Sequence, residues 1–400
     1  MSAVETETVP FERHADAAPL IVHVVRQFLP NRGGLEDVVA NLCRQSLKRG
    51  LRVRVVTCDS LFSAPGQKLA AREIVEGIEI VRIPWSGSTR YPFAPQVFRH
   101  VADADLVHVH AVDFFFDALA WGRLLHGRPM VATTHGGFFH TRKFATLKKI
   151  WFRTLTRLSA SAYRTVVCCS ASDLRQFAEI APQRAPLIEN GADIGKFAGA
   201  AAREPLRRIV TIGRFSLNKR LDRLLDAVAA LQAHGGGWHL DIVGAPSDLS
   251  GADLEREIAA RGLAKAVTLH VSPENAAIRE ILSRASLFAS ASEYEGFGIV
   301  AVEAMSAGLL PVLNANEAFV TLGKRHGMLR IADFSRPEAA AAALADAHAA
   351  LTQEADVLRA RLMREASAYS WETAAERYFE VYAGIIALPD QAPSQRGQLR

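Results

Sequence analysis

The stretch Glu293–Gly308 has the sequence EYEGFGIVAVEAMSAG and combines a glycine-rich loop, two acids and the start of a helix. The apolar run Leu287–Ser290 before it predicts a buried strand. Gly296 and Gly298 allow a tight turn, and the periodic apolar residues of Ile299–Ala307 then predict a helix. We therefore expect a strand, a loop and a helix here, the repeating unit of an α/β fold.

The chemistry of this loop favours a ligand that carries both phosphate and hydroxyl groups. A helix that begins behind glycines points unpaired backbone N–H groups at the loop, which suits a phosphate. Glu295 in the loop and Glu303 in the helix are poor phosphate ligands, but carboxylates accept hydrogen bonds from the hydroxyls of a ribose or a sugar ring. Acids for hydroxyls and amides for phosphate together indicate a nucleotide-sugar site.

Two other interpretations of the same residues stay open. Gly296, Gly298 and Ala301 match the dinucleotide fingerprint G-x-G-x-x-A, which requires an acid about 20 residues later at the end of the next strand. Glu317 lies near that distance, but it follows the strand expected at Pro311–Leu313. The third interpretation is ordinary packing of a strand against a helix.

The composition is that of a globular protein with two domains. At 400 residues the chain exceeds what one core usually serves, and 49% of its residues are hydrophobic. No apolar run approaches the roughly 18 to 20 residues that span a bilayer, and the polar N-terminus shows no secretion signal. The four cysteines lack metal-ligand spacing, so we expect reduced core residues of a cytosolic protein: Cys43, Cys58, Cys168 and Cys169.

The net charge of +5 is concentrated in one segment. Between Asp117 and Asp173 the sequence has nine basic residues and no acid, so the remainder of the chain carries −4. Within it, Phe138–Leu158 predicts a basic amphipathic helix with aromatic residues, which suits an anionic lipid surface. The alternatives are a solvated basic face and, with no recognition motif beside it, a nucleic-acid surface. The residues expected at the membrane or acceptor are Arg142, Lys143, Lys148, Lys149, Trp151 and Arg153.

Two successive runs of alternating strands and helices predict two doubly wound domains. The first run has strands expected at 20–25, 53–57, 78–83, 106–110, 129–133, 166–169 and 187–193, and the second at 209–212, 240–243, 267–271, 287–290, 311–313 and 329–331. We expect a tail at 1–18, a first domain at 19–196, a linker at 197–206, a second domain at 207–370, a C-terminal helix at 371–386 and a disordered tail at 387–400.

Further candidate ligand-binding residues follow expected strands, where open α/β sheets bind ligands. His135 follows one strand and is succeeded by two glycines, and Gly33 and Gly34 precede the helix expected at 35–48. Arg214 and Lys219 follow the first strand of the second run and are a plausible diphosphate clamp.

Two other patterns are expected to be structural. Asp103-Ala-Asp105 resembles a D-x-D metal motif, but it lies where a helix runs into a buried strand. His108 and His110 share one face of that strand, and such a pair is more often part of the core than of a site.

With these residues in place, the chain resembles the retaining glycosyltransferases of the GT-B fold, family four, from about residue 20 to 385. The matching motifs, in family order, are Gly33-Gly34, His135-Gly136, Asn190-Gly191-Ala192-Asp193, Gly213-Arg214 with Lys219, and Glu295 with Glu303. Longer strings resemble the xanthan- and acetan-type exopolysaccharide mannosyltransferases, namely SxRYPxAP at 88–95, HxxDFFxD at 110–117, LHGxPMVxxTHGGFFHT at 125–141 and IWFxTLTR at 150–157.

That resemblance implies two Rossmann-like domains that face a central cleft, and an enzyme at the cytoplasmic face of the inner membrane. Such enzymes transfer mannose from GDP-mannose to a cellobiosyl diphosphate polyprenol in an α-1,3 linkage, with no nucleic-acid partner and no metal expected. Front-face attack, in which the leaving phosphate accepts the acceptor's proton, would explain retention without a nucleophile.

The resemblance also implies the roles of matched residues. Glu303 would bind the ribose diol, Glu295 the mannose hydroxyls, and His135 the donor sugar near the reacting carbon. Arg214 and Lys219 would hold the diphosphate together with helix amides near Gly34 and the loop Gly296, Phe297 and Gly298. Arg220 departs from the pattern, because relatives usually carry glycine there.

Three alternative functions remain open from the sequence. The same fold could use another nucleotide sugar or acceptor. A Rossmann enzyme that binds NAD would share the α/β order, and a non-catalytic glycan-binding protein at the membrane would share the basic segment.

Overall fold

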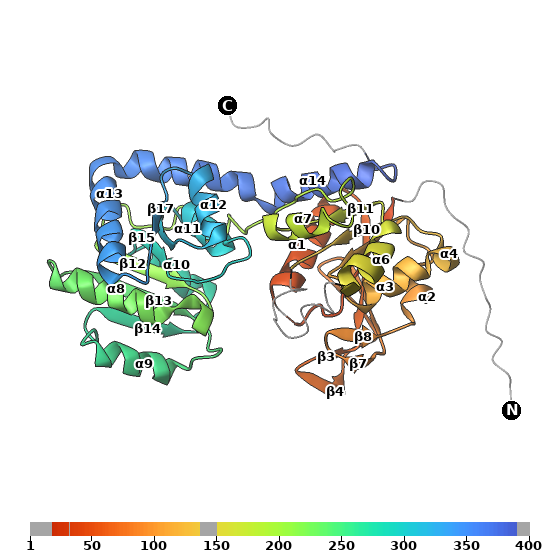
Figure 1. Ribbon diagram of the computed structural model, residues 1–400, viewed down its shortest axis with the longest axis horizontal. Coiled ribbons are helices and arrows are strands. Elements are labelled where there is room, and N and C mark those ends of the chain that lie inside the picture. Colours follow the sequence, from red (N-terminus) through yellow and green to blue (C-terminus); the bar gives the residue numbers. More distant parts are fainter. Residues whose placement is uncertain (1–17, 32, 137–149, 390–400) are drawn as a thin grey trace. The chain divides into compact units, whose positions relative to one another are not determined.

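The computed structural model describes residues 18–31, 33–136 and 150–389 (Figure 1). The chain divides between Ile188 and Glu189 into two compact units, and the segment from Arg377 onward belongs to the first unit. Each unit has its own parallel sheet and its own hydrophobic core.

The first unit is built on a seven-stranded sheet in the order β11-β10-β9-β1-β2-β6-β5. All pairs are parallel except that of β5 with β6. If the six parallel strands are numbered 1 to 6 in chain order, their order across the sheet is 3-2-1-4-5-6, the order of dinucleotide-binding folds. The bounds are β1 (Leu20–Val24), β2 (Arg52–Cys58), β5 (Arg72–Val75), β6 (Ile78–Ile83), β9 (Leu106–His110), β10 (Met130–Thr133) and β11 (Thr165–Val167).

Helices flank this sheet, and two small hairpins extend from it. The helices are α1 (Gly34–Lys48), α2 (Val97–Val101), α3 (Phe114–Trp121), α4 (Arg123–His126), α6 (Arg157–Ser161) and α7 (Ala171–Phe177), with a π-helical turn η1 (Phe152–Thr156). The hairpins pair β3 (Ser60–Leu61) with β4 (Ala64–Lys68) and β7 (Ser86–Ser88) with β8 (Tyr91–Phe93). From α14 (Trp371–Ala383), Tyr378 and Tyr382 are buried in this unit.

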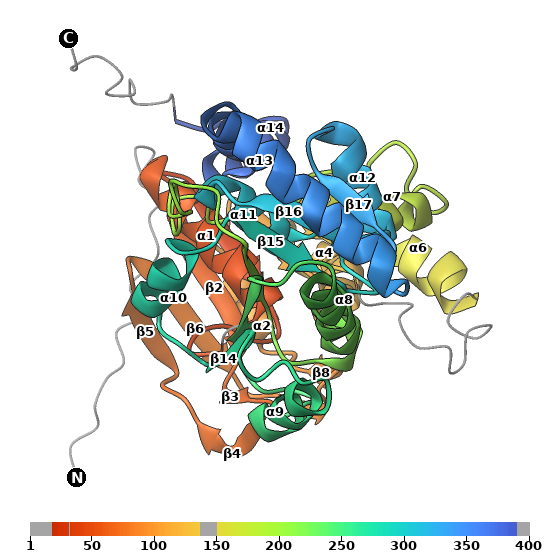
Figure 2. The same ribbon diagram turned by 90° about the vertical axis from the view of Figure 1, so that its left-hand side faces the viewer.

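The second unit repeats the same strand order in a fully parallel sheet, β14-β13-β12-β15-β16-β17. Its strands are β12 (Arg208–Ile212), β13 (His239–Gly244), β14 (Val267–Val271), β15 (Leu287–Ser290), β16 (Leu310–Asn314) and β17 (Arg330–Ala332). Its helices are α8 (Leu221–Ala233), α9 (Gly251–Ala260), α10 (Asn275–Leu282), α11 (Ile299–Ala307), α12 (Glu317–Arg325) and α13 (Pro337–Ala366). Figure 2 shows the long helix α13, which packs against α8 and α11.

The hydrophobic pattern explains this architecture. Central strands such as β1 (LIVHV), β9 (LVHVH) and β15 (LFAS) are buried along their whole length, because helices cover both faces of a parallel sheet. The four cysteines are buried and unpaired, as expected. Among the described helices, none is both long and apolar enough to cross a bilayer.

Two expected elements differ in the structure. Residues 187–193 do not form a strand; they make isolated bridges from Leu187 to Cys168 and from Ala192 to Ser370. From the sequence alone, residues 114–125 are expected to form one helix. It breaks at Gly122, where an added Cβ would lie 2.2 Å from the Phe98 ring, and the short helix α4 follows. In the segment 197–206, Phe197 and Ala200 pack into the core of the second unit.

Candidate functional site

In the second unit, the candidate ligand-binding residues gather where the strand order reverses, between β12 and β15. The carboxyl ends of parallel strands at such a reversal are where open α/β sheets bind ligands. A small pocket opens there, and its lining includes Gly213, Arg214, Lys219 and Ser290. The loops that follow the two strands, 213–220 and 291–298, contain most of the residues expected to bind a nucleotide sugar.

The loops after β12 and β15 are joined by ion pairs, Lys219 with Glu295 and Arg220 with Glu293, and by an asparagine. Lys219 Nζ lies 2.6 Å from Glu295 Oε1, and both side chains are largely shielded from solvent. Asn218 donates to the Tyr294 carbonyl at 2.8 Å and accepts from the Tyr294 N–H at 3.0 Å, while its own carbonyl accepts from the Glu293 N–H. The sequence did not predict this role for Asn218. Its only signal was its position in the loop 213–220, beside Lys219 and Arg220.

Arg220 adopts a backbone conformation that favours glycine. Its φ is +47°, in the left-handed region, at the N-cap of α8. The turn thus suits the glycine that related sequences are expected to carry here. The Arg220 guanidinium forms ion pairs with Asp222 at 2.7 Å and with Glu293 at 2.5 Å, which offset part of the strain.

The glycine loop leads directly into α11, as the sequence predicts. Gly298 has φ +90° and caps α11 without a side chain, so the first N–H groups of the helix have no side-chain cap. Glu303 lies half-buried on the same helix. Phe297 packs against Tyr369 with ring centroids 5.5 Å apart, and Tyr369 is in turn hydrogen-bonded to His326.

The dinucleotide interpretation of this loop lacks its acid. The strand after α11 is β16, and it ends at Asn314. Glu317 is the first residue of α12 and therefore does not follow the strand directly. A dinucleotide fold needs a carboxylate at the strand end to bind the ribose, so the geometry disfavours a nicotinamide cofactor here.

In the first unit, a strained histidine marks the carboxyl end of the sheet. His135 follows β10 with φ +53°, and Ala111 follows β9 with φ +73°. Residues without the freedom of glycine adopt such angles at a cost, and they concentrate at functional sites. His135 is partly exposed, but the loss of hydration around its ring lowers its pKa to about 3. It is therefore a neutral imidazole at physiological pH.

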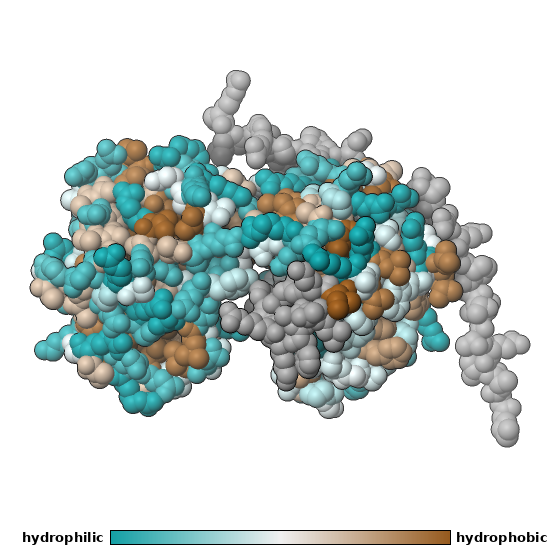
Figure 3. Space-filling model, in the orientation of Figure 1, coloured by the Kyte–Doolittle hydropathy of each residue, from teal (hydrophilic) through white to brown (hydrophobic). Residues whose placement is uncertain are grey.

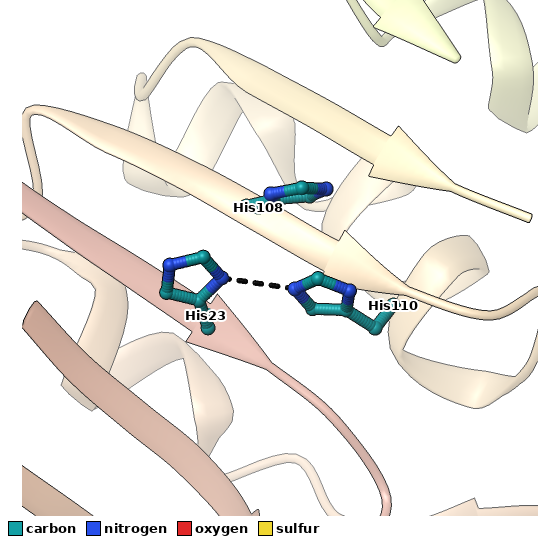
Figure 4. Close-up of side chains that lie close together, drawn as sticks. All are labelled: His23, His108 and His110. Carbon is teal, nitrogen blue, oxygen red and sulfur yellow. Dashed lines mark hydrogen bonds between the residues drawn. The ribbon is translucent and has the colours of Figure 1, made fainter. Parts of the chain in front are cut away.

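Three further histidines, His23, His108 and His110, lie close together on one face of the sheet (Figure 4). His23 on β1 stands beside His108 on β9, and His110 follows two residues later. His110 Nδ1 lies 3.0 Å from His135 Nε2, and His110 Nε2 lies 2.9 Å from His23 Nδ1. Burial lowers the pKa of His23 to about 3 and the pKa of both His108 and His110 well below the usual value.

The three buried histidines also have a spacing that a metal ion could use. One ring nitrogen from each of His23, His108 and His110 lies within 4.8 Å of the others. The nitrogens of His108, however, are hydrogen-bonded to Tyr382 at 2.6 Å and to Thr133 at 2.8 Å. His23 and His110 are hydrogen-bonded to each other, so protein groups already occupy most of these nitrogens. The sequence predicted His108 and His110 as core residues, and they are buried; His23 drew no prediction.

Two acids near these histidines have structural contacts. Asp113 caps α3 by accepting from the Phe115 N–H at 3.0 Å. Its second oxygen has no partner within the described part of the chain, and burial raises its pKa to about 7. Asp117 accepts from Ser159 at 2.6 Å and from Tyr91 at 2.9 Å. These contacts give the HxxDFFxD string a structural reason.

The glycines before α1 have an acid beside them. Gly33 caps α1 without a side chain, and a Cβ at this position would lie 2.6 Å from a carboxylate oxygen of Glu36. Glu36 is buried and accepts from Asn31 at 2.8 Å. An anion near Gly33 and Gly34 would therefore meet a carboxylate unless Glu36 moved.

The helix expected at residues 138–158 is described only from Ile150 onward, so Arg142, Lys143, Lys148 and Lys149 lie outside the described residues. Trp151 is exposed, and Arg153 pairs with Glu179 at 2.9 Å on the surface. The D-x-D acids are engaged elsewhere: Asp103 pairs with Arg54, and Asp105 accepts from the Leu20 N–H at the amino end of the sheet.

The parallel strands of the two sheets have the same order. In the second unit, acidic and basic side chains surround a glycine loop whose helix has no side-chain cap among the described residues. These features define a GT-B glycosyltransferase architecture. The family model described as Glycosyltransferase Family 4 matches residues 32–196, and that described as Glycosyl transferases group 1 matches residues 196–356. The chain belongs to this family of glycosyltransferases.

The relatives and a solved structure agree with this assignment. The chain is 43% identical over 95% of its length to a GDP-mannose:cellobiosyl-diphosphopolyprenol alpha-mannosyltransferase of Komagataeibacter xylinus, of which it covers 97%. It is 42% identical over 92% of its length to a protein of the same name from Xanthomonas campestris, of which it covers 98%. A glycosyltransferase structure from Rickettsia africae shares the fold, with a TM-score of 0.71 at 15% identity, over 92% of this chain and 98% of that chain.

Proposed function

We propose that this enzyme transfers mannose from GDP-mannose to a cellobiosyl diphosphate polyprenol, in an α-1,3 linkage, during exopolysaccharide repeat-unit synthesis. The two relatives named for this donor and acceptor match nearly the whole chain. The observation that carries the proposal is the Lys219–Glu295 pair beside the uncapped N-terminus of α11. It brings a cation and backbone N–H groups for a diphosphate together with a carboxylate for sugar hydroxyls.

The proposed mechanism follows from the charges that develop as the donor breaks. Arg214 and Lys219 would hold the diphosphate and stabilise its growing negative charge, together with the α11 amides. Glu295 would orient the mannose hydroxyls, and Glu303 the ribose diol. His135 would donate an uncharged hydrogen bond to the donor sugar. The leaving phosphate would take the acceptor's proton as the acceptor attacks from the same face, which retains the configuration.

These groups would perform the transfer without a metal ion. Cationic side chains and a helix N-terminus would supply the positive charge that a divalent ion supplies elsewhere. Activity should then persist in the presence of a chelator.

We also propose that the first unit rests on an anionic membrane, where a lipid-linked acceptor would be reached. Helix α4 exposes two leucines almost completely, Leu124 at 97% and Leu125 at 83%, beside the exposed Trp121. Arg123 and Arg128 flank them, in the acid-free segment. Figure 3 shows hydrophobic side chains on the surface where Figure 1 draws α4 and α6. Exposed apolar side chains flanked by cationic ones suit the interface of an anionic bilayer.

A transfer assay tests the donor, the acceptor and the site. Purified enzyme would receive GDP-mannose or UDP-glucose with a synthetic cellobiosyl diphosphate lipid, with and without EDTA. We expect EDTA-resistant transfer from GDP-mannose that falls at least about 100-fold in Glu295→Ala and in His135→Ala, about 2.7 kcal/mol of barrier. Glu280→Ala removes a largely exposed carboxylate on α10, away from the two loops, and is the matched control that should stay near wild type.

The other outcomes of this assay are informative. Transfer only from UDP-glucose would refute the mannosyl assignment and keep the fold. Loss of activity in EDTA, restored by Mg2+, would contradict the metal-free mechanism.

Sedimentation with vesicles tests the membrane surface. We expect Leu124→Ser with Leu125→Ser to weaken binding to phosphatidylglycerol vesicles at least about tenfold, because each buried leucine contributes about 1.5 to 3 kcal/mol. Val357→Ser is the control, since Val357 is exposed on α13 in the other unit. Equal vesicle binding by the double variant and the control would refute the surface.

A further inference from the structure

The histidines behind His135 form a continuous hydrogen-bonded chain. It runs from His135 through His110 to His23, with nitrogen–nitrogen distances of 3.0 and 2.9 Å. The three residues come from adjacent parallel strands or their ends, β10, β9 and β1. The chain thus connects a partly exposed histidine at the carboxyl end of the sheet to a ring in the core.

Each ring in this chain carries a single proton. Burial lowers the pKa of His23 and His135 to about 3 and that of His110 well below the usual value, so the imidazolium forms are absent at neutral pH. A neutral imidazole has one N–H donor and one acceptor nitrogen. The N–H groups along the chain must therefore all point the same way, toward His135 or toward His23.

The inner end of the chain decides between the two directions. His23 Nε2 is buried and has no hydrogen-bond partner among the residues that the structure describes. If the protons pointed inward, this nitrogen would carry an orphaned N–H in the core. If they point outward, it keeps only a lone pair. Orphaned buried N–H groups are rarer in proteins than under-satisfied acceptors, so the outward direction is favoured.

We propose that His23 and His110 are positioning residues that hold His135 as the Nδ1–H tautomer. His23 Nδ1–H donates to His110 Nε2, and His110 Nδ1–H donates to His135 Nε2. The only proton of the His135 ring is then on Nδ1, as a fixed donor for a ligand oxygen. The other nitrogen is occupied, which sets the tautomer as a neighbouring group does for catalytic and metal-bound histidines.

His108 provides a built-in comparison. It is as deeply buried as His110, lies two residues away on the same strand, and stacks on His110 with ring centroids 4.1 Å apart. Its nitrogens, however, bond to Tyr382 and Thr133, outside the chain. A substitution at His108 disturbs the same core without breaking the connection to His135.

Proton–nitrogen correlation spectra of the full chain, labelled with nitrogen-15 at histidine, test the tautomer directly. We expect the His135 signals of wild type to show the Nδ1–H form. His110→Phe should lose that signature, and His108→Phe should keep it. His110→Asn should keep it too, because the amide can donate where Nδ1–H does. An Nε2–H form of His135 in wild type would overturn the proposal, whether or not any variant folds.

The effect on transfer rests on the proposed function and is measured separately. We expect His110→Phe to lower kcat/KM for the donor about tenfold, the effect of about one hydrogen bond, and His110→Asn to recover most of it. An Nδ1–H tautomer in a protein that transfers no sugar would refute the proposed function and leave this inference standing. If Co2+ added to the protein produced visible absorption, and His23→Phe lost that absorption, these imidazoles would bind a metal ion. That result would overturn the proposed hydrogen-bonded series of histidines.

Discussion

At the scale of single residues, Arg220 shows how the backbone constrains the loop after β12. Its φ of +47° costs a residue with a side chain about 1 kcal/mol relative to glycine. The ion pairs with Asp222 and Glu293 act in the other direction, and two such surface pairs together contribute about 1 kcal/mol, close to the cost of the strain. We therefore expect Arg220→Gly to leave the free energy of unfolding within about 0.5 kcal/mol of wild type, and Arg220→Ala to lower it by about 1 kcal/mol. Urea denaturation measures both, and equal values for the two variants would contradict the strain.

At Asn218 the side chain matters more than the backbone conformation, because it is hydrogen-bonded to the loop 291–298 after β15. Its amide makes two hydrogen bonds to the backbone of Tyr294, the residue before Glu295. Asn218→Ala should remove both hydrogen bonds and so destabilise the ordered conformation of the loop by about 2 kcal/mol. We expect this loss to raise the KM for the donor about tenfold. Asn218→Asp keeps the acceptor and loses the donor, so it should fall between wild type and alanine. Donor kinetics measure this order, and an unchanged KM in Asn218→Ala would show that the loop holds its shape unaided.

The residues of the site differ in how far the sequence reveals them. Glu295, Lys219, Gly298 and Glu303 could be proposed as ligand-binding residues, because their chemistry and their place in a loop after a strand, or in the helix that follows it, suggest that role. Asn218 and His23 could not, because their function depends on which distant backbone or ring they meet. The sequence of β1, LIVHV, contains one polar letter, and only strand order shows that His110 lies beside it.

At the scale of elements, the junction between the glycine loop and α11 depends on one glycine. Gly298 has φ +90°, and a Cβ there would lie 2.8 Å from the Phe319 ring. Gly298→Ala should therefore lower the free energy of unfolding by about 1 to 3 kcal/mol and weaken donor binding. A Cβ at Gly296 would meet no atom of the described residues within 4 Å, so Gly296→Ala is the matched control and should be near neutral in stability. Thermal unfolding measures both variants, and similar losses in the two would refute the argument.

The elements of the second unit were the more predictable ones. β14, β15 and α11 begin and end at the expected residues, because turn residues bound each periodic run. The break between α3 and α4 and the π-helical geometry of η1 were not predicted, since each depends on packing. Gly122 ends α3 against Phe98, and η1 buries Phe152 and Thr156 while Trp151 stays exposed. The amphipathic helix expected at residues 138–158 therefore does not give the buried face correctly from Ile150 onward, where Ile150, Trp151 and Leu158 are exposed.

At the scale of the whole molecule, two sheets of the same strand order follow from the two alternating runs of strands and helices. The number of domains and the fold class could thus be predicted. The return of the chain to the first unit at Arg377 could not, because nothing in the helix near residue 371 indicates its partner. Tyr378 and Tyr382 contact Thr133 and His108, more than 200 residues earlier in the chain.

This burial of histidines gives the folded state a predictable response to acid. Between pH 6.5 and about 3, the unfolded chain binds protons on His23 and His135 that the folded chain does not. Each such group lowers the free energy of unfolding by up to about 1.4 kcal/mol per pH unit as the pH falls, and has no effect above pH 6.5. Asp113 has the opposite effect between pH 7 and 3.8. Its pKa is raised to about 7 in the folded state, so only the folded chain binds this proton there, and the free energy of unfolding rises as the pH falls. His108 and His110 have lowered pKa values and add to the loss, so the net effect of acid is destabilising.

His23→Phe isolates one group of this cluster. The variant lacks the ring that takes up a proton only on unfolding, so its stability should fall less steeply between pH 6 and pH 4, by about 1.4 kcal/mol per pH unit. Above pH 7 the two proteins should show parallel curves, offset by any change in packing. Urea denaturation at closely spaced pH values measures the two slopes. Equal slopes below pH 6 would mean that His23 is protonated in the folded protein, and the outward direction of the histidine chain would then lose its basis as well.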